Sequence, residues 1–484
     1  MAYKHGVYGS EVPTSLVPMT NVSAGLPVVF GTAPVHLATD AAKANVPVLC
    51  YTYAEAVEAL GYSDDWESYT LCEFMKSHFA LFNMAPVVFV NVLDVAKHKT
   101  AVSDAEAALA DGVAEISEPV VLSTLVVKKT AAGQPLVLNT DYTAAYNDEG
   151  KLILTALTGG ALESETTCVV SYDKVNPAAV DGDDIIGGVD VVTGEYEGLE
   201  LVHQIYPRFG LVPGIILAPG WSHLSAVAAV MKAKTTNISG HFEAICICDV
   251  DTDTVTKYSD VSAWKNTNNY VDPRQVLCWP KVTLGGVKYH LSAQLAGDIC
   301  KTDAAHDDVP YWSPSNQSLQ CDGAVSGADG SEKEIFLDTS NAAYLNGQGI
   351  VTVLNFIGGW KAWGNRTTAY PSVTDPKDAF IPIRRMFNWV NNTLITSFWQ
   401  KVDNPANKRL IATIVDSANV WLNGLTARGF ILGGRVEFRE DENPITDLMD
   451  GIIRFHVFFT PPSPARDIEF IQEYDPDYLS TLFE

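Results

Sequence analysis

The chain has few cysteines, few charged residues for its length and no long apolar run. Eight cysteines among 484 residues are too sparse for a disulfide framework, so we expect a reducing compartment. The longest apolar stretch, residues 84–96, is interrupted by Asn91 and Asp94, and the first ten residues lack the apolar segment of a signal peptide. The sequence therefore predicts synthesis in the cytoplasm, without a membrane span.

Basic residues are also scarce, since 32 Lys and Arg stand against 58 Asp and Glu and give a formal net charge of −26. Proteins that bind nucleic acids draw their affinity from clustered Lys and Arg, so we expect no nucleic-acid partner. Apolar residues make up 47% of the chain and charged residues 19%, a balance typical of packed globular domains. At roughly 150 residues per domain, the length predicts several domains.

Catalytic and metal-binding motifs are missing as well. The sequence has no Gly-x-x-x-x-Gly-Lys phosphate loop, no His-Glu-x-x-His and no Gly-x-Ser-x-Gly. Asp249, Asp251 and Asp253 begin like a calcium loop, but Thr254 stands where that loop needs glycine and Asp260 where it needs glutamate. We predict that the chain holds no metal and no cofactor and has no catalytic residues.

Three residue pairs have both a functional and a structural interpretation. Ser222 and His223 are adjacent on a predicted helix and point in different directions, so Ser222 is interpreted as a helix N-cap. Two cysteines one residue apart, at 246 and 248, lack further ligands for a metal and are interpreted as part of a buried strand. Trp360 and Trp363 fit core or interface packing better than a sugar-stacking platform, since no basic cluster accompanies them.

The order of the predicted elements indicates a multidomain protein of mixed α/β and α+β class. Alternating strands and helices predict an α/β core, and a stretch of short β-branched runs between turn residues predicts an inserted all-β domain. Apolar stripes then predict two long helices, followed by two alternating strands. The predicted regions are an extended N-terminal arm (1–23), the core in two pieces (24–96 and 181–378), the β insertion (97–180), a C-terminal helix-sheet domain (379–464) and an extended C-terminal arm (465–484).

The two arms predict a second subunit. An extended segment with apolar side chains leaves its backbone groups and those side chains unpaired in a monomer. The small sheet of the helix-sheet domain has edges on which such a segment can add as a strand. A donor on one copy and an acceptor on another form a heterologous contact, which builds rings or helical filaments. The residues alone thus predict an assembly protein.

Several motifs resemble one family. His5-Gly-Val-Tyr-Gly-Ser-Glu-Val-Pro13 followed by Leu26-Pro-Val-Val-Phe-Gly-Thr-Ala33 resembles the opening of contractile tail sheath proteins of phages and phage-like injection systems. Further matches lie in the central and C-terminal regions: Asp184-Ile-Ile-Gly-Gly188, Asp272-Pro-Arg-Gln-Val276, Phe398-Trp-Gln-Lys-Val-Asp-Asn-Pro405, Trp421-Leu-Asn-Gly-Leu-Thr-Ala-Arg-Gly429, Phe455-His-Val-Phe-Phe-Thr-Pro-Pro462 and Ile468-Glu-Phe470. The resemblance covers residues 1–96 and 181–484.

This resemblance implies a helical stack of hexameric rings around an inner tail tube, with terminal arms that join each subunit to its neighbours. It also implies baseplate and tail terminator proteins as partners, and a virion tail or extracellular contractile particle that is assembled in the cytoplasm of a bacterial host. By position, the donor residues are Tyr3, Val7, Tyr8 and Val12 in one arm and Ile468, Phe470, Ile471, Tyr474 and Tyr478 in the other. The acceptor sheet contains Val436, Phe438, Phe455 and Val457.

The resemblance further implies a metastable sheath that contracts ring by ring and drives the tube through an envelope. Residues 379–464 carry nine basic and eight acidic residues, so this block could face an acidic tube, with Arg384 and Arg385 as candidates; a solvated face is equally compatible. Two other classes stay open from the residues alone, an α/β enzyme and a carbohydrate-binding surface protein.

Overall fold

The computed structural model describes residues 17–147 and 149–483. Its centre is a six-stranded sheet in the order β14-β13-β12-β1-β3-β2, in which all neighbours are parallel except the edge strand β2. The strands are β1 (Pro27–Gly31), β2 (Val48–Cys50), β3 (Val87–Asn91), β12 (Ile215–Leu217), β13 (Ile245–Asp249) and β14 (Gln275–Cys278). Cys246 and Cys248 are buried in β13, which confirms their structural interpretation.

Helices cover both faces of this sheet, so its strands read as continuous apolar runs. One face packs against α4 (Val202–Phe209), α5 (Ser225–Ala233) and α6 (Tyr258–Thr267). The other packs against α1 (Tyr53–Leu60), α2 (Thr70–Met75) and α7 (Leu291–Ala304). α2 begins at Thr70 and is continued by a π-helix, Lys76–Leu81.

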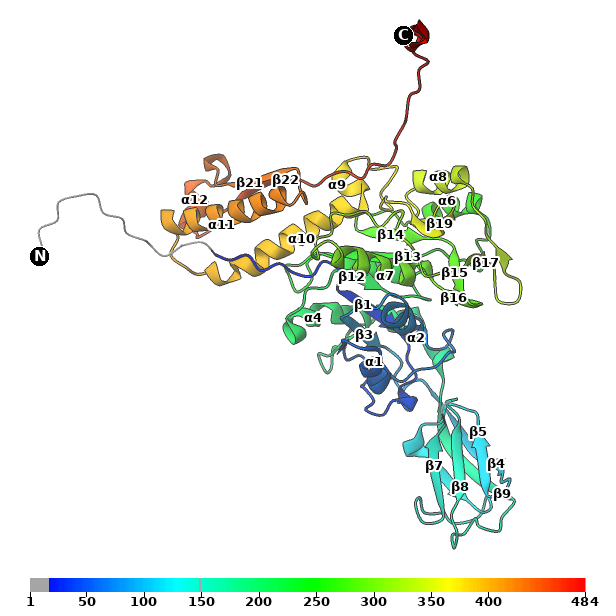
Figure 1. Cartoon of the computed structure of the whole chain (residues 1–484). Helices are drawn as coiled ribbons and strands as arrows, with labels where there is room; N and C mark the ends of the chain where they lie inside the picture. The colour runs from blue at the N-terminus through cyan, green and yellow to red at the C-terminus, as the bar shows by residue number, and fades with distance from the viewer. Residues whose placement is uncertain (1–16, 148, 484) are drawn as a thin grey trace, which may run out of the picture.

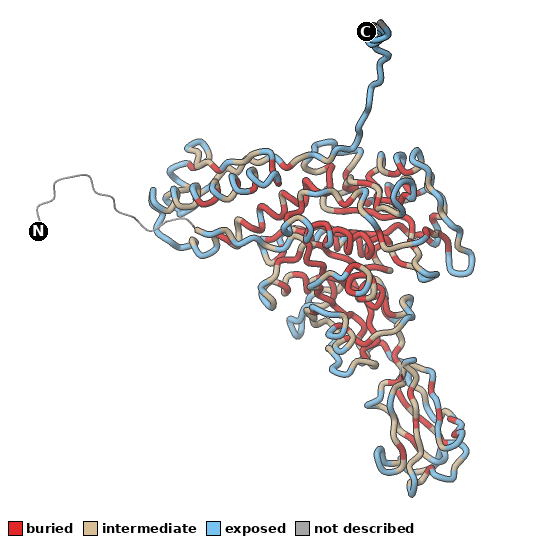
Figure 2. The backbone as a smooth tube through the Cα atoms, viewed as in Figure 1, coloured by how far each residue is buried: buried red, intermediate tan, exposed pale blue. Residues whose placement is uncertain are grey.

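Residues 99–175 form a separate β unit that projects away from the rest of the molecule (Figure 1). Two three-stranded antiparallel sheets, β4-β9-β6 and β5-β8-β7, face each other across their own apolar cluster. The strands are β4 (Lys99–Ala108), β5 (Val113–Ile116), β6 (Val126–Lys128), β7 (Tyr142–Tyr146), β8 (Leu152–Ala156) and β9 (Thr167–Val175). Figure 2 shows that the buried residues of this unit lie along its own axis.

Short sheets extend the core beyond β14. β16, β15, β17 and β18 form an antiparallel sheet, and β19 and β20 form a hairpin beside α8 (Thr339–Gly347). Their bounds are β15 (Lys281–Leu284), β16 (Val287–Tyr289), β17 (Gly323–Ser326), β18 (Lys333–Glu334), β19 (Thr352–Asn355) and β20 (Trp360–Trp363). Trp360 and Trp363 are half-buried in this hairpin.

The C-terminal part consists of two long helices and a two-stranded sheet above the core (Figure 1). The short helix α9 (Pro376–Ala379) leads into α10 (Ile381–Phe398), and α11 (Lys408–Ala427) packs beside α10 and against the sheet through a separate apolar cluster. The sheet pairs β21 (Gly433–Glu437) with β22 (His456–Thr460), and α12 (Ile445–Met449) lies between them in sequence. Among the described helices, none combines the length and the apolar character that a membrane crossing requires.

Candidate functional site

A crevice of about 520 Å³ opens at the carboxyl ends of the parallel strands. β1 and β12 lie side by side there, and the chain continues from them toward opposite edges of the sheet. Ligands of doubly wound α/β proteins bind at such a switch point, so this is the place where an enzyme of this class would hold its substrate. Glu73, His223, Asp249 and His290 are among the side chains that line it.

Asp249, at the end of β13, is buried and bound by its neighbours. The backbone N–H of Ser292 donates to its Oδ1 at 3.0 Å, and the Ser292 and Ser222 hydroxyls donate to its Oδ2. Burial raises the pKa of the Asp249 carboxyl, against the opposing effect of His290 and these hydrogen bonds. Ser222 therefore connects two strand ends; the N-cap residue of α5 is Leu224, and the predicted cap at Ser222 is wrong.

Glu73 and His290 form a second internal pair in the crevice. The Glu73 carboxylate accepts the backbone N–H of His290, and its Oε2 lies 2.7 Å from the His290 Nδ1. Burial alone would lower the pKa of His290, but the Glu73 carboxylate outweighs it and the pKa is raised. This pair ties α2 to the residue that precedes α7.

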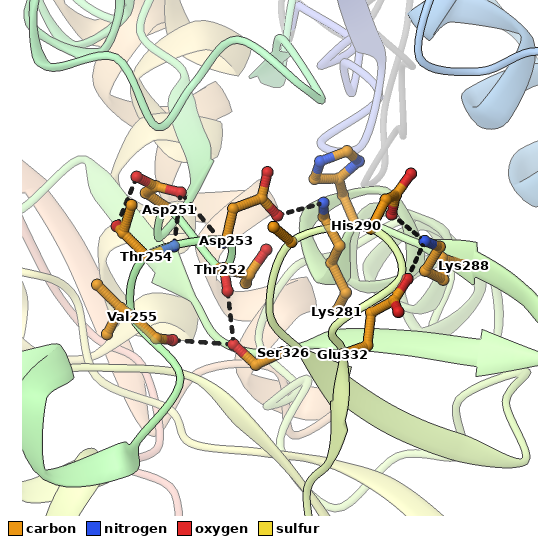
Figure 3. Close-up of polar contacts among 12 residues, drawn as sticks. Asp251, Thr252, Asp253, Thr254, Val255, Lys281, Lys288, His290, Ser326 and Glu332 are labelled. Atoms are coloured by element: carbon orange, nitrogen blue, oxygen red, sulfur yellow. Dashed lines mark hydrogen bonds and ion pairs between the residues drawn. The ribbon is translucent and has the colours of Figure 1, made fainter.

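The loop after β13 is held by contacts within the chain (Figure 3). Asp251 accepts hydrogen bonds from the backbone of Asp253 and from the Thr254 hydroxyl, as in a turn. Lys281 lies 3.4 Å from Asp253, and Lys288 lies 2.6 Å from Glu332. The described residues contain no group of three or more His, Cys, Asp or Glu side chains placed to hold a metal ion. The polar groups of the crevice thus join strand ends and loops to one another.

A second set of contacts fixes the N-terminal root, which we define as residues 17–25. This segment lies along α10 and α11 (Figure 1, dark blue). Side chains of the two helices bind it at successive positions: the Ser417 and Ser397 hydroxyls accept the N–H groups of Val17 and Thr20, the Trp421 indole donates to Asn21, and the Trp389 indole donates to the Val22 carbonyl. The predicted donor residues Tyr3, Val7, Tyr8 and Val12 lie outside the described residues.

The sheet of β21 and β22 has one edge that a helix covers and one that is open. The Asn419 side chain of α11 donates to the Val436 carbonyl at 3.0 Å and accepts the Val436 N–H at 2.8 Å, so this backbone unit points away from β22. Val457 stands opposite Val436, and opposed residues of an antiparallel pair share the same orientation. The N–H and C=O of Val457 therefore point outward from β22, and those of Phe459 do so too.

No other strand pairs with that outer edge of β22 within residues 17–147 and 149–483. Val436 packs against α11, and Phe438 and Phe455 flank the ladder with ring centroids 6.0 Å apart. Phe438 and Phe455 lie just beyond the paired residues of β21 and β22. Sequence reasoning missed Asn419; its only signal is an amide beside the apolar stripe of α11.

The C-terminal arm leaves the molecule beyond β22 and extends away from it (Figure 1, red). Its apolar side chains are exposed: Ile468 70%, Phe470 85%, Ile471 88%, Tyr474 76% and Tyr478 74%. Residues 461–475 have no regular secondary structure, whereas Pro476–Phe483 form a 3₁₀ helix, so the predicted extended conformation fails over the last residues. The chain thus presents an unpaired strand edge and an exposed apolar segment on one subunit.

Arg384 and Arg385 are not on the surface, which corrects their assignment as tube-facing residues. The Arg385 guanidinium forms a buried ion pair with both carboxylate oxygens of Asp303 and also donates to the Ala24 carbonyl. Arg384 is buried and pairs with Asp378 at 3.1 Å. Arg385 thus contacts α7 and the N-terminal root, and Arg384 contacts Asp378 just before α10, which a periodic pattern within one helix cannot reveal.

Comparisons with known proteins agree with this architecture. A scan against models of protein families finds no match. The tail sheath protein of Burkholderia phage BcepMu is 27% identical over 496 aligned residues, which cover 99% of this chain and 98% of that protein. The tail sheath protein of Escherichia phage P2 is 24% identical and covers 72% of this chain and 86% of its own length. Over nearly its whole length, the chain is similar to contractile tail sheath proteins.

Solved structures show the same fold as this chain. The sheath of an extracellular contractile injection system, PVC, in its contracted state matches with a TM-score of 0.57 at 13% identity and covers 99% of both chains. The contracted helical sheath of the anti-feeding prophage matches with a TM-score of 0.56 at 13% identity, covering 98% of this chain and 100% of the other. These relatives and structural neighbours are structural sheath proteins, not enzymes.

Proposed function

We propose that the chain polymerises as stacked hexameric rings around an inner tail tube, and that its sheath contracts to drive this tube through a bacterial envelope. The particle is a phage tail or an extracellular contractile particle, assembled in the cytoplasm of the bacterial host. Its partners are copies of itself, the tube protein, and the baseplate and tail terminator proteins. The single observation that carries this proposal is the coexistence of an open β22 edge and an exposed apolar arm on one subunit.

The C-terminal arm supplies the donor strand in this proposal. Ile468, Phe470 and Ile471 are each at least 70% exposed, and burying such a side chain contributes about 1.5–3 kcal/mol. A partner strand would also pair the outward backbone groups of Val457 and Phe459. Because the donor and the acceptor lie at different places on the subunit, the contact is heterologous and propagates from copy to copy. The N-terminal donor at Tyr3, Val7, Tyr8 and Val12 remains a prediction.

During contraction, the cores would move as rigid bodies while the arms keep the subunits connected. The N-terminal root suits this role, because its hydrogen bonds to α10 and α11 fix where that arm starts. The C-terminal arm is free of such contacts over residues 467–471, so it can change direction without disturbing its own subunit. The energy of contraction would come from new contacts between cores, with no nucleotide.

A proline in the open edge tests this proposal. Val457→Pro removes the N–H that would bond an incoming strand but leaves the β21–β22 ladder, because that N–H points outward. Val457→Thr keeps the N–H and the branched shape, and serves as the matched control. We expect both variants to fold, with melting temperatures close to that of the parent, and only Val457→Pro to lose tube formation by electron microscopy. Normal tubes from folded Val457→Pro would contradict strand addition at β22.

A further inference from the structure

A groove of about 760 Å³ lies at the base of the C-terminal arm. Its walls come from the loop at residues 311–317, from α8, from residues 363–370 after β20, and from residues 462–466 at the start of the arm. The volume falls within the roughly 300–1,000 Å³ of typical ligand pockets. Four aromatic side chains line the groove: Tyr311, Trp312, Trp363 and Tyr370.

Two arginines, Arg366 and Arg466, also line the groove. The Arg366 guanidinium lies 3.7 Å from the ring centre of Phe380 and 4.4 Å from that of Tyr370. Neither Arg366 nor Arg466 forms an ion pair with a carboxylate in the part of the chain that the structure describes. Burial lowers the pKa of Arg366, and the positive charge of Arg466 adds to this effect. In a chain of net charge −26, two neighbouring cations of this kind would attract an anionic group.

One segment of this chain has the chemistry that such a groove would bind. The C-terminal arm carries six acidic residues and one basic residue, and its distal part alternates carboxylates with tyrosines in Glu473-Tyr-Asp-Pro-Asp-Tyr478. Carboxylates would pair with the arginines, and the tyrosine rings would pack against the aromatic walls. We propose that the groove receives residues 472–479 of the C-terminal arm of a neighbouring copy of this chain. This inference rests on the proposed strand addition and extends it to the end of the arm.

The groove lies at the end of the acceptor sheet that a donor strand running in the direction of β22 would reach. Gly433 pairs with Thr460, so β21 begins and β22 ends at the same end of the sheet. The groove is lined by Gly429 and Pro462, which lie just outside that end. A donor strand formed by residues 468–471 that runs in the direction of β22 would deliver residue 472 there. If fully extended, the seven residues 472–478 would reach at most about 24 Å.

Occupation of the groove would link successive arms. Arg466 belongs to the start of the arm that the acceptor subunit sends to the next copy, and Pro462 and Pro464 precede it in the same wall. An incoming arm that pairs with Arg466 would therefore fix the direction in which the outgoing arm leaves. The groove would thus couple the arm that a subunit receives to the arm that it sends to the next subunit.

Photocrosslinking in the full chain tests the proposal. The photoreactive residue p-benzoylphenylalanine replaces Tyr478, and tubes are assembled from a mixture of isotopically light and heavy chains so that contacts between copies are recognised by mass. We expect mixed light-heavy crosslinks from position 478 to residues 311–317 or 363–370. Tubes whose crosslinks reach only other surfaces would overturn the groove proposal and leave strand addition intact. A parent chain that forms no tubes would overturn both.

Charge reversal gives an independent test that does not depend on the photoreactive residue. Arg466→Glu is expected to raise the critical concentration for assembly by about fivefold, and Glu473→Arg alone by a similar factor. The double variant exchanges the two charges and is expected to recover most of the loss. Arg208→Glu, an exposed change on α4, is the matched control and should have no effect. Additive losses in the double variant would contradict the pairing.

Discussion

At the scale of single residues, the buried ion pair of Arg385 and Asp303 joins three parts of the chain. Arg385 lies on α10 and Asp303 on α7, with exposed side-chain fractions of 3% and 4%, and the guanidinium also holds the Ala24 carbonyl of the N-terminal root. A buried carboxylate that loses its cation is costly, whereas an exposed pair contributes little. Replacing a buried arginine by methionine should therefore cost more stability than replacing an exposed lysine by methionine.

We predict that Arg385→Met lowers the free energy of unfolding by about 3–5 kcal/mol, because Asp303 stays buried without a partner. Lys97→Met breaks the half-exposed pair with Glu197 and should cost at most about 1 kcal/mol. Urea denaturation followed by tryptophan fluorescence measures both. Equal losses in the two variants would show that the Arg385 pair does not hold the root to the core.

His78 predicts a pH dependence of stability. It is fully buried in the π-helix and stacks on Phe74, and burial lowers its pKa to about 3. Between that value and the ordinary pKa of about 6.5, the unfolded chain binds a proton that the folded chain does not, so stability falls as the pH falls. His78→Phe lacks this proton. When the pH falls from 7.5 to 5.5, we expect the free energy of unfolding of the variant to rise by about 1 kcal/mol relative to that of the parent. Free energies of unfolding that change equally with pH in the two proteins would contradict this.

At the scale of elements, the local sequence pattern predicted the strands and helices whose apolar residues pack into the core. The buried strands around Val29, Val88 and Ile216 and the stripes of α10 and α11 follow directly from alternation and helical periodicity. β4 shows the limit. Its residues 104–108, Asp-Ala-Glu-Ala-Ala, include good helix formers, yet they pair with β9, because the partner strand lies about 65 residues away and local propensity contains no information about it.

The N-terminal root is an element that the sequence could not place, since its partners are almost 400 residues distant. We predict that replacing Ser397 and Ser417 by Ala speeds amide exchange at Val17 and Thr20 by about tenfold, because each amide loses its acceptor. Hydrogen-exchange mass spectrometry of the peptide 17–25 measures this change. Ser225→Ala, an exposed serine on α5, is the control. Unchanged exchange in the double variant would show that packing alone holds the root.

At the scale of the whole molecule, the sequence predicted the class of the protein better than its surfaces. The order of strands and helices and the family motifs pointed to a sheath protein, and the comparisons confirm it. The candidate surfaces were harder to predict, because whether Arg384 is exposed or the β22 edge is open depends on how distant elements pack. The regions 1–23, 97–180 and 465–484 stay predictions as domains, although residues 99–175 do form their own cluster.

The core clusters contain no residue beyond position 459, so the subunit should fold without its C-terminal arm. We predict that a chain without residues 466–484 melts within about 2 °C of the parent but does not polymerise, because the donor strand is missing. A chain without residues 1–16 keeps the anchored root and should behave in the same way. Melting temperature and polymerisation, measured for the parent and the two truncated chains, separate an effect on assembly from an effect on folding.

Electron microscopy of these purified chains over a range of protein and salt concentrations tests the central claim most directly. We expect the full chain to form hollow tubes of stacked six-subunit rings, with density for the C-terminal arm running onto the β22 edge of a neighbouring subunit. We expect both truncated chains to stay as single folded subunits. Full-length protein that stays monomeric under all conditions, or truncated chains that form the same tubes, would contradict it.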